Sequence, residues 1–490
     1  MNTRPIRFFH QGAIVQVDAA EPTRTVLQWL REDARCTGTK EGCAEGDCGA
    51  CTVVLGELDA QGGLALKPIN ACIQFLPTLD GKALFTVQDL SAPGQPLHPV
   101  QQSLVDCHGS QCGFCTPGFV MSLWACVQQH QAAGTVPSRQ DLADDLSGNL
   151  CRCTGYRPIL DAGQRMFEAP PVPLDAAPVA AALRAMQADP PLHRAGFHAP
   201  RTLADFAALR QALPQARVLA GSTDMGLWVT KQLRDPGELI SITAVAELKR
   251  IEHTAAHISI GAAASLQDAW SALAAEWPAL REVMLRFASL PVRRSGTMGG
   301  NLANGSPIGD SAPVLMALDA VLLLRRGESV RRLPLHGFYT GYMQNQLQPG
   351  EFVQAIEVPR AATLGRSVRA YKISKRFDCD ISALCAGLSI RLQGEHIADV
   401  RLAYGGMAAT VLRAAGAEAA LVGQPWSEAS LQSAMAALAQ DFTPLTDMRA
   451  SSGYRLQVAQ NLLRRFWLET RPADPLPASA TSVWSRAEPA

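Results

Sequence analysis

The cysteines of this chain are concentrated in its first third. Of thirteen cysteines among 490 residues, eleven lie between Cys36 and Cys153, and the other two are Cys379 and Cys385. Residues 1–22 lack the apolar core and cleavage site of a signal peptide. The most apolar stretch, residues 312–324, is too short to span a membrane. We therefore expect a cytoplasmic protein without a membrane anchor, in which clustered cysteines stay reduced and act as metal ligands or catalytic groups.

Four of these cysteines have the spacing of a plant-type [2Fe–2S] site, Cys-x4-Cys-x2-Cys with a more distant fourth cysteine. They are Cys43, Cys48, Cys51 and Cys72. The glycines at positions 42, 46 and 49 allow a tight loop that brings backbone N–H groups towards negatively charged sulfur. The alternative is a structural zinc site, which normally has about two to four residues between the ligands in both of its halves. The spacing favours the iron–sulfur cluster.

A second group pairs a Cys-x2-Cys motif with a Cys-x-Cys motif further along the chain. Its members are Cys112, Cys115, Cys151 and Cys153. The single spacer of Cys-x-Cys is awkward for tetrahedral zinc, whereas two short cysteine turns at helix starts can hold a [2Fe–2S] cluster between them. Zinc stays open as the alternative on spacing alone. Cys36, Cys107 and Cys126 are left over and are expected to be small buried apolar residues.

Three segments, in this order, resemble the iron–sulfur segments of the xanthine oxidase/dehydrogenase family of molybdenum hydroxylases. They are "KEGCAEGDCGACTV", "QCGFCTPGF" and "NLCRCTGYRPI". The resemblance implies that the second group of cysteines holds a second [2Fe–2S] cluster, the one nearer the molybdenum cofactor. It also implies that Gln111 approaches the pterin of that cofactor.

Two further loops have the composition of phosphate-binding segments. "VLAGSTDMG" (218–226) follows an expected strand, and "SGTMGGNLANGSPIGD" (295–310) is rich in small residues. Small residues and hydroxyls let backbone N–H groups approach a pyrophosphate closely. The chain has no Rossmann fingerprint and no Walker loop. From composition alone, either loop could also be an ordinary turn.

Together the two loops resemble the FAD-binding domain of the same family. By position, the resemblance implies FAD contacts at Val218, Leu219, Ala220, Gly221, Ser222, Thr223, Asp224, Met225, Phe287, Thr297, Met298, Gly299, Gly300, Asn301, Asp310, Val353 and Lys372. Ala220 replaces a second glycine of many relatives, and Asn304 and Gly305 also depart from the commoner pattern. Lys372 could place positive charge beside the isoalloxazine ring, or it could be a surface-strand lysine. Arg376, Asp378 and Asp380 are expected near the nicotinamide acceptor.

The elements that would position these groups indicate an α+β multidomain fold. Residues 4–17 predict a β-hairpin, and helices are expected within 118–130, 138–148 and 158–167. With the resemblance, the expected parts are a ferredoxin-like (β-grasp) [2Fe–2S] domain (1–90), a helical-bundle [2Fe–2S] domain (91–168), a linker (169–192), an α+β FAD-binding domain (193–365), a C-terminal α+β flavoprotein domain (366–470) and a tail (471–490).

The resemblance implies the iron–sulfur/flavin subunit of a two-chain member of the family. A large molybdopterin-binding subunit would hydroxylate hypoxanthine or xanthine, with two copies of each chain in the assembly. Electrons would pass through the two [2Fe–2S] clusters and FAD to NAD⁺, so no catalytic residue for hydroxylation is expected on this chain. The formal net charge of zero argues against a nucleic-acid partner. The alternatives are the corresponding subunit of an aldehyde or N-heterocycle hydroxylase, and a zinc-stabilised scaffold without redox activity.

Overall fold

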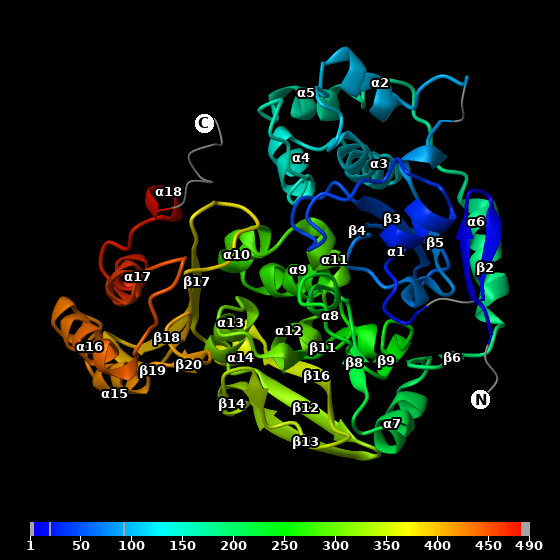
Figure 1. Cartoon of the computed structure of the whole chain (residues 1–490). Helices are drawn as coiled ribbons and strands as arrows, with labels where there is room; N and C mark the ends of the chain where they lie inside the picture. The colour runs from blue at the N-terminus through cyan, green and yellow to red at the C-terminus, as the bar shows by residue number, and fades with distance from the viewer. Residues whose placement is uncertain (1–3, 19–20, 92–93, 482–490) are drawn as a thin grey trace. The chain divides into compact units, whose positions relative to one another are not determined.

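The structure is a computed structural model that describes residues 4–18, 21–91 and 94–481 (Figure 1). The chain divides into two compact units. The first contains residues 1–247, 265–267 and 288–297, and the second contains residues 248–264, 268–287 and 298–490. Among the described residues, no helix combines the length and apolar character that crossing a bilayer requires. Part of the expected tail, residues 482–490, lies outside the described residues.

The first unit begins with a five-stranded sheet in the order β2-β1-β5-β3-β4. Its strands are β1 (Ile6–His10), β2 (Ala13–Val17), β3 (Thr52–Leu58), β4 (Leu64–Asn70) and β5 (Ala83–Phe85). The expected hairpin is confirmed, because β1 and β2 pair antiparallel around a turn in which Gly12 has φ +79°. The short helix α1 (Val26–Gln28) continues into a π-helical turn, Trp29–Asp33, and buries Val26 and Leu27. This arrangement confirms the ferredoxin-like expectation.

Four helices form the next part of the first unit. They are α2 (Pro99–Asp106), α3 (Thr116–Ala133), α4 (Arg139–Asp145) and α5 (Arg157–Arg165). Ser138 caps α4 through a capping box with Asp141, as the Ser-x-x-Asp spacing predicts. The middle of α3 is buried on all sides because it packs against β3 as well as against the other helices. The helical-bundle expectation is confirmed.

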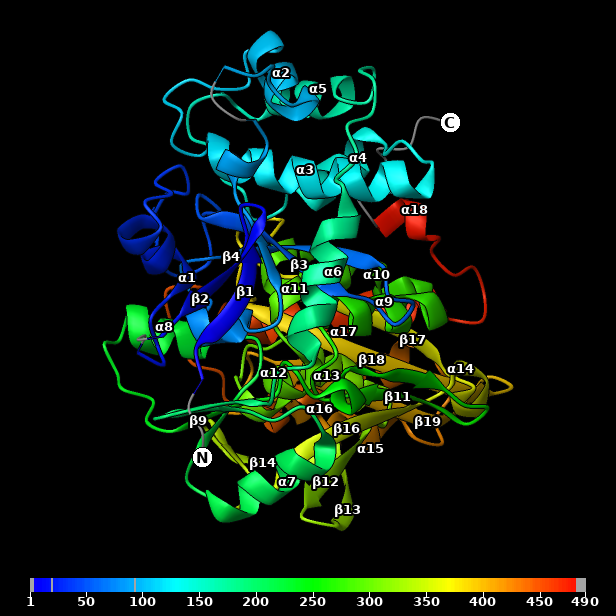
Figure 2. The same cartoon turned by 90° about the vertical axis from the view of Figure 1, so that its right-hand side faces the viewer.

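Residues 169–192 differ from a plain linker. They contain the twelve-residue helix α6 (Ala176–Gln187), which is capped by Asp175. Val179, Leu183 and Met186 pack in one core with Phe9 of the sheet and with α3. Figure 2 shows α6 crossing in front of the first sheet. The Ala-rich composition that suggested a linker also suits a helix with one small apolar face.

A second, four-stranded sheet completes the first unit in the order β6-β7-β9-β8. Its strands are β6 (Leu192–Arg194), β7 (Phe197–Ala199), β8 (Arg217–Leu219) and β9 (Leu239–Ser241). Its helices are α7 (Leu203–Ala212), α8 (Met225–Thr230) and α11 (Leu290–Ser295). Strands β7 and β8 both run parallel to β9, and Phe197, Leu219 and Leu239 join the core of the first sheet.

The second unit contains two antiparallel sheets. The first has the order β10-β11-β16-β12-β13 and is formed by β10 (Ile251–His253), β11 (His257–Gly261), β16 (Phe352–Pro359), β12 (Val321–Arg326) and β13 (Ser329–Pro334). Helix α12 (Met298–Asn304) packs against it, whereas α10 (Arg281–Arg286) and α13 (Ser311–Ala317) pack against the last sheet of this unit. Helix α9 (Leu266–Glu276) begins in the first unit and continues here. A small pair, β14 (Tyr339–Gly341) and β15 (Gln344–Asn345), lies between β13 and β16 in the sequence.

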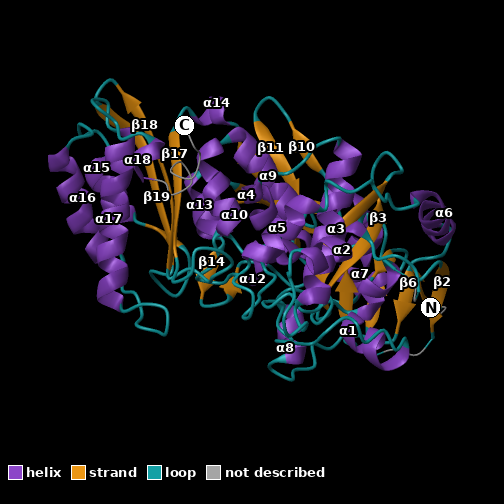
Figure 3. Cartoon of the chain, turned by 90° about the horizontal axis from the view of Figure 1, so that it is seen from above, coloured by secondary structure: helices purple, strands orange, loops and turns teal. Residues whose placement is uncertain are grey.

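The last sheet of the second unit has the strand order β17-β18-β19-β20. Its strands are β17 (Ser367–Ile373), β18 (Leu384–Gln393), β19 (His396–Gly405) and β20 (Leu412–Arg413). Figure 3 shows α15 (Ala415–Leu421), α16 (Glu428–Asp441) and α17 (Ser452–Thr470) gathered beside these strands. Their apolar faces form one core with the sheet. The expected α+β multidomain fold is therefore confirmed.

Candidate metal-cluster and flavin sites

The structure brings the sulfur atoms of the first four cysteines into one group. Cys43 and Cys48 lie in the loop before β3, Cys51 directly precedes that strand, and Cys72 follows β4. The pairing of β3 with β4 aligns Thr52 with Asn70, so the ends that carry Cys51 and Cys72 meet. Side-chain hydrogen bonds join Cys72 to Cys43 and Cys51, and join Cys43 to Cys48.

Electrostatics in this group favour a positively charged centre. Hydrogen bonds to Cys43 and Cys51, together with burial, raise the pKa of the Cys72 thiol. The bond with Cys48, followed by the bond with Cys72, lowers the pKa of Cys43, and the bond with Cys72 lowers the pKa of Cys51. Several thiolates gathered in one place repel each other. A metal centre that neutralises the thiolates removes this repulsion, so the donor set fits an iron–sulfur cluster.

The glycine at position 49 is required by a close approach between two loops. Gly49 has φ +70°, and a Cβ atom there would lie 2.3 Å from the carbonyl oxygen of Gly148. The backbone N–H of Cys48, in the same loop, donates to Cys43 Sγ at 3.4 Å, as expected for a loop that turns N–H groups towards sulfur. The loop that holds the first cysteines therefore packs directly against the segment that leads to Cys151.

The other four cysteines are also brought together, as two hydrogen-bonded pairs of free thiols. Cys115, at the N-cap of α3, hydrogen-bonds with Cys151, and Cys112 hydrogen-bonds with Cys153. Burial, followed by the bond to Cys151, raises the pKa of Cys115 to about 12. Burial acts in the same direction on Cys151, but hydrogen bonds from Thr154 outweigh it and lower the pKa of that thiol. The nearby Gln111, like Cys112 and Cys153, is exposed to solvent.

Asn149 connects the two cysteine groups, and sequence reasoning missed it. Its side-chain N–H groups donate to the carbonyl oxygen of Gly49 at 3.1 Å and to Thr52 Oγ1 at 3.2 Å. Its Oδ1 accepts from Ser122 of α3 at 2.6 Å, and the residue is 3% exposed. The only signal in the sequence is its place two residues before Cys151, because Gly49 and Thr52, which accept its N–H groups, are 100 and 97 residues away in the chain.

In the first unit, the loop after β8 has the features of a binding loop for a polar ligand. A Cβ atom at Gly221 would lie 1.9 Å from the carbonyl oxygen of Ser295, so only glycine fits there. Ser222 has φ +64°, is 4% exposed, and its hydroxyl has no hydrogen-bond partner among the described residues. A buried hydroxyl without a partner is costly unless a bound group satisfies it. The loop therefore fits a phosphate-bearing cofactor such as FAD.

The other FAD contacts predicted in this unit lie on either side of that binding loop in the sequence or follow α11. Leu219 is the buried end of β8, Asp224 is the N-cap of α8, and Met225 is the first residue of that helix. Thr297, which is 7% exposed, forms an isolated bridge with Ser265.

In the second unit, the glycine-rich segment forms the start of α12. The backbone N–H of Met298 donates to Ala264, and that of Gly299 donates to Ala262, each at 3.0 Å. These two groups are therefore engaged within the protein and are not free donors. Gly300 and Asn301 follow them and are half-buried. The composition of the segment could not predict that these two N–H groups are already bonded, because their acceptors lie in the residues that follow β11.

Lys372, Asp310 and Ser382 form a buried polar network in the same unit. Lys372 Nζ lies 2.6 Å from Asp310 Oδ2 and 2.7 Å from Ser382 Oγ, and Ser382 donates to Asp310 Oδ1 at 2.6 Å. The side chains of Lys372 and Asp310 are 1% and 3% exposed. The alternative that Lys372 is a surface lysine is therefore wrong. Because Asp310 neutralises the ammonium group, the pair brings little net charge to a neighbouring ligand.

The other predicted residues of this unit have separate places. Phe287 ends α10 and packs against Trp270, with ring centroids 6.1 Å apart. Val353 is buried in β16, opposite Leu324. Arg376 pairs with Asp380 across the loop after β17, and Asp378 lies between them.

Comparison with known families matches nearly all of the chain. Four family descriptions match in succession: "2Fe-2S iron-sulfur cluster binding domain" (8–74), "[2Fe-2S] binding domain" (86–164), "FAD binding domain in molybdopterin dehydrogenase" (193–361) and "CO dehydrogenase flavoprotein C-terminal domain" (369–470). The chain thus has two [2Fe–2S]-binding domains and an FAD-binding domain.

Individual relatives agree with these matches. The xanthine dehydrogenase of Emericella nidulans is 32% identical over 96% of this chain, and aldehyde oxidase 4 of Cavia porcellus is 29% identical over 95%. The chain spans 39% of the length of each. A solved chain of the CO dehydrogenase from Oligotropha carboxidovorans is 29% identical, with a TM-score of 0.52, over 56% of this chain and 96% of its own length.

Proposed function

Because the chain belongs to the xanthine oxidase/dehydrogenase family of molybdenum hydroxylases, we propose that it is the electron-transfer subunit of a two-chain xanthine dehydrogenase. In this proposal a large partner subunit holds the molybdenum cofactor and hydroxylates hypoxanthine or xanthine. This chain delivers the electrons to NAD⁺ in the cytoplasm, and the assembly contains two copies of each subunit. The observation that carries the proposal is that the chain gathers two sets of four cysteines, and that the segments carrying these two sets are hydrogen-bonded to each other.

The chain's own residues have distinct roles in this proposal. Cys43, Cys48, Cys51 and Cys72 hold one cluster, and Cys112, Cys115, Cys151 and Cys153 hold the other. The segments 218–225 and 297–301, with Phe287, Asp310, Val353 and Lys372, bind FAD. When bound, the clusters carry single electrons and the flavin supplies the two-electron chemistry that reduction of NAD⁺ requires.

The protein's contribution is to hold and position the cofactors. Asn149 fixes the distance between the two cysteine-bearing loops, because its side chain bonds to Gly49 of one loop and to Ser122 beneath the other. Ser222 offers a buried hydroxyl to the cofactor's polar groups. The exposed Gln111 and Cys112 are on the surface that we propose the molybdenum subunit covers.

A second candidate is the corresponding subunit of an aldehyde or N-heterocycle hydroxylase. It is favoured by the similarity to aldehyde oxidase 4, which covers almost the same share of this chain as the similarity to xanthine dehydrogenase. The substrate pocket would lie on the partner subunit in both cases.

Two measurements separate these possibilities. Metal and flavin analysis of the purified chain should give about four irons and one FAD, whereas zinc in place of the irons, with no flavin, would identify a scaffold and refute the proposal. The native complex should then reduce NAD⁺ with xanthine. A complex that reduces NAD⁺ with an aldehyde but never with xanthine would support the second candidate.

A further inference from the structure

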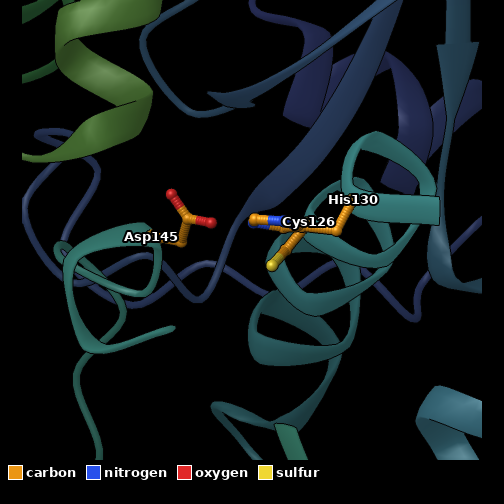
Figure 4. A group of neighbouring side chains, drawn as sticks. All are labelled: Cys126, His130 and Asp145. Carbon is orange, nitrogen blue, oxygen red and sulfur yellow. The ribbon is translucent and has the colours of Figure 1, made fainter. Parts of the chain in front are cut away.

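Three side chains with metal-binding atoms meet between α3 and α4, away from the eight proposed cluster cysteines. They are Cys126, His130 and Asp145, and their ligand atoms all lie within 4.8 Å of one another. Cys126 and His130 are four residues apart on α3, so they project from the same face of that helix. Figure 4 shows Asp145 reaching towards them from the neighbouring segment.

We propose that Cys126, His130 and Asp145 form a binding site for one zinc ion, which links α3 to α4. Thiolate, imidazole and carboxylate are the three ligand types that zinc takes in proteins, and a site with three protein ligands keeps a fourth position for water. Tetrahedral ligand atoms are roughly 3.3–3.7 Å apart. Side-chain rotations that bring the ligand atoms about 1 Å closer would therefore complete the geometry.

The surroundings of His130 prepare one ring nitrogen for a metal. Its Nδ1 lies 2.8 Å from Thr135 Oγ1, which leaves Nε2 as the ligand atom. When Nδ1 donates its proton to that hydroxyl, Nε2 carries a lone pair, the form of imidazole that binds metals. The ring of Phe167 packs edge-on against the imidazole, with centroids 6.1 Å apart, and limits its rotation.

The position of Asp145 is a second, independent observation. Asp145 is the last residue of α4, where the helix dipole disfavours negative charge, and the last turn of this helix contains no basic residue. A bound cation would compensate for this placement. Burial disfavours the charged carboxylate, whereas His130 and Arg294 favour it and Asp141 opposes it. Asp145 and His130 are half-buried, so an ion can enter from solvent, whereas Cys126 is 4% exposed.

Zinc binding at this site would release one proton and leave the bound ion without net charge. The Cys126 thiol is hydrogen-bonded to the Asp145 carboxyl. Zinc binding would replace the thiol proton, which leaves to solvent, and one thiolate with one carboxylate would neutralise the doubly charged ion. The site does not depend on which substrate the proposed partner subunit oxidises.

The test is metal binding by the full, iron-loaded chain. Equilibrium dialysis against Zn²⁺ should give about one zinc per chain while the iron content stays constant, and Co²⁺ should give the absorption of a tetrahedral thiolate complex. His130→Gln and Asp145→Asn should each weaken binding at least about tenfold. Cys126→Ala should abolish the absorption that Co²⁺ adds to the iron-loaded chain. Cys107→Ala, a change at a cysteine of the same domain outside both cluster groups, should change neither readout.

Thermal bleaching of the clusters gives a second readout. Zinc should raise the bleaching temperature of the wild-type chain but not that of the His130 and Asp145 variants, which keep the buried core intact. An absence of zinc binding by the wild-type chain would overturn the proposal. Equal binding by wild type, His130→Gln and Asp145→Asn would overturn it as well.

Discussion

The backbone N–H of Leu150 donates a 3.0 Å hydrogen bond to the carbonyl oxygen of Cys48. Leu150 directly precedes Cys151, so this bond joins a proposed ligand of one cluster to a proposed ligand of the other through a few backbone atoms. The two cysteine groups are thus parts of one rigid local structure. Four predictions follow from the contacts around them and around Lys372.

Gly49→Ala should prevent both clusters from assembling. The new methyl group would meet the Gly148 carbonyl at 2.3 Å while the backbone stays at φ +70°, so the loops must separate. Iron per chain should fall well below half of the wild-type value. Gly134→Ala is the matched control, because Gly134 has φ +65° but nothing within 4 Å of a Cβ atom. That control should cost about 1–2 kcal/mol of stability and keep its iron. Full iron in Gly49→Ala would contradict the expectation.

Asn149→Ala should loosen the connection between the cysteine groups without removing a ligand. It leaves the buried Ser122 hydroxyl without its acceptor, which costs about 1–3 kcal/mol, and removes one of the hydrogen bonds to the Gly49 carbonyl. Cluster bleaching during heating should therefore begin at a lower temperature. Ser122→Ala removes one of the same bonds and should have a smaller effect. If both variants bleach at the wild-type temperature, Asn149 does not hold the loops together.

Cys72→Ser should remove one cluster and leave the other. Cys72 is buried and hydrogen-bonded to Cys43 and Cys51, so its replacement breaks one sulfur group only. Iron should fall from about four to about two per chain, and one of two electron paramagnetic resonance signals should disappear after reduction. Cys107→Ser should retain both signals. Retention of four irons in Cys72→Ser would show that this cysteine is not a ligand.

Lys372→Met should destabilise the second unit and weaken FAD retention. The substitution leaves the Asp310 carboxylate buried without its 2.6 Å partner, and breaking a buried ion pair from one side costs about 3–5 kcal/mol. The double variant Lys372→Met/Asp310→Asn should lose less than the sum of the two single variants, because it removes both charges. The temperature at which FAD is released on heating measures the loss of stability and of FAD retention together. Additive losses would show that the two residues do not act as a pair.

Local spacing predicted the parts of the site that depend on nearby residues. The short cysteine motifs, the glycine at position 49 and the Ser138 cap are each defined within a few residues. The structure brings the cysteines together and contains the cap, and the role of the cysteines as cluster ligands stays a prediction. Asn149 and the Leu150–Cys48 bond were not predictable, because they depend on the approach of segments about 100 residues apart. The burial of Lys372 likewise depends on Ser382 and Asp310, which lie outside its strand.

The position of α6 has a consequence for how the chain can be divided. Val179, Leu183 and Met186 cover Phe9 and its neighbours on the first sheet, so this helix belongs to the core of the iron–sulfur part even though it follows that part in sequence. A fragment that stops at residue 168 would expose this apolar face and is expected to aggregate. A fragment that continues through residue 188 would keep the face covered. An engineered iron–sulfur fragment should therefore include α6, and because Phe197, Leu219 and Leu239 also join the core of the first sheet, a cut directly after α6 would still expose that second apolar contact.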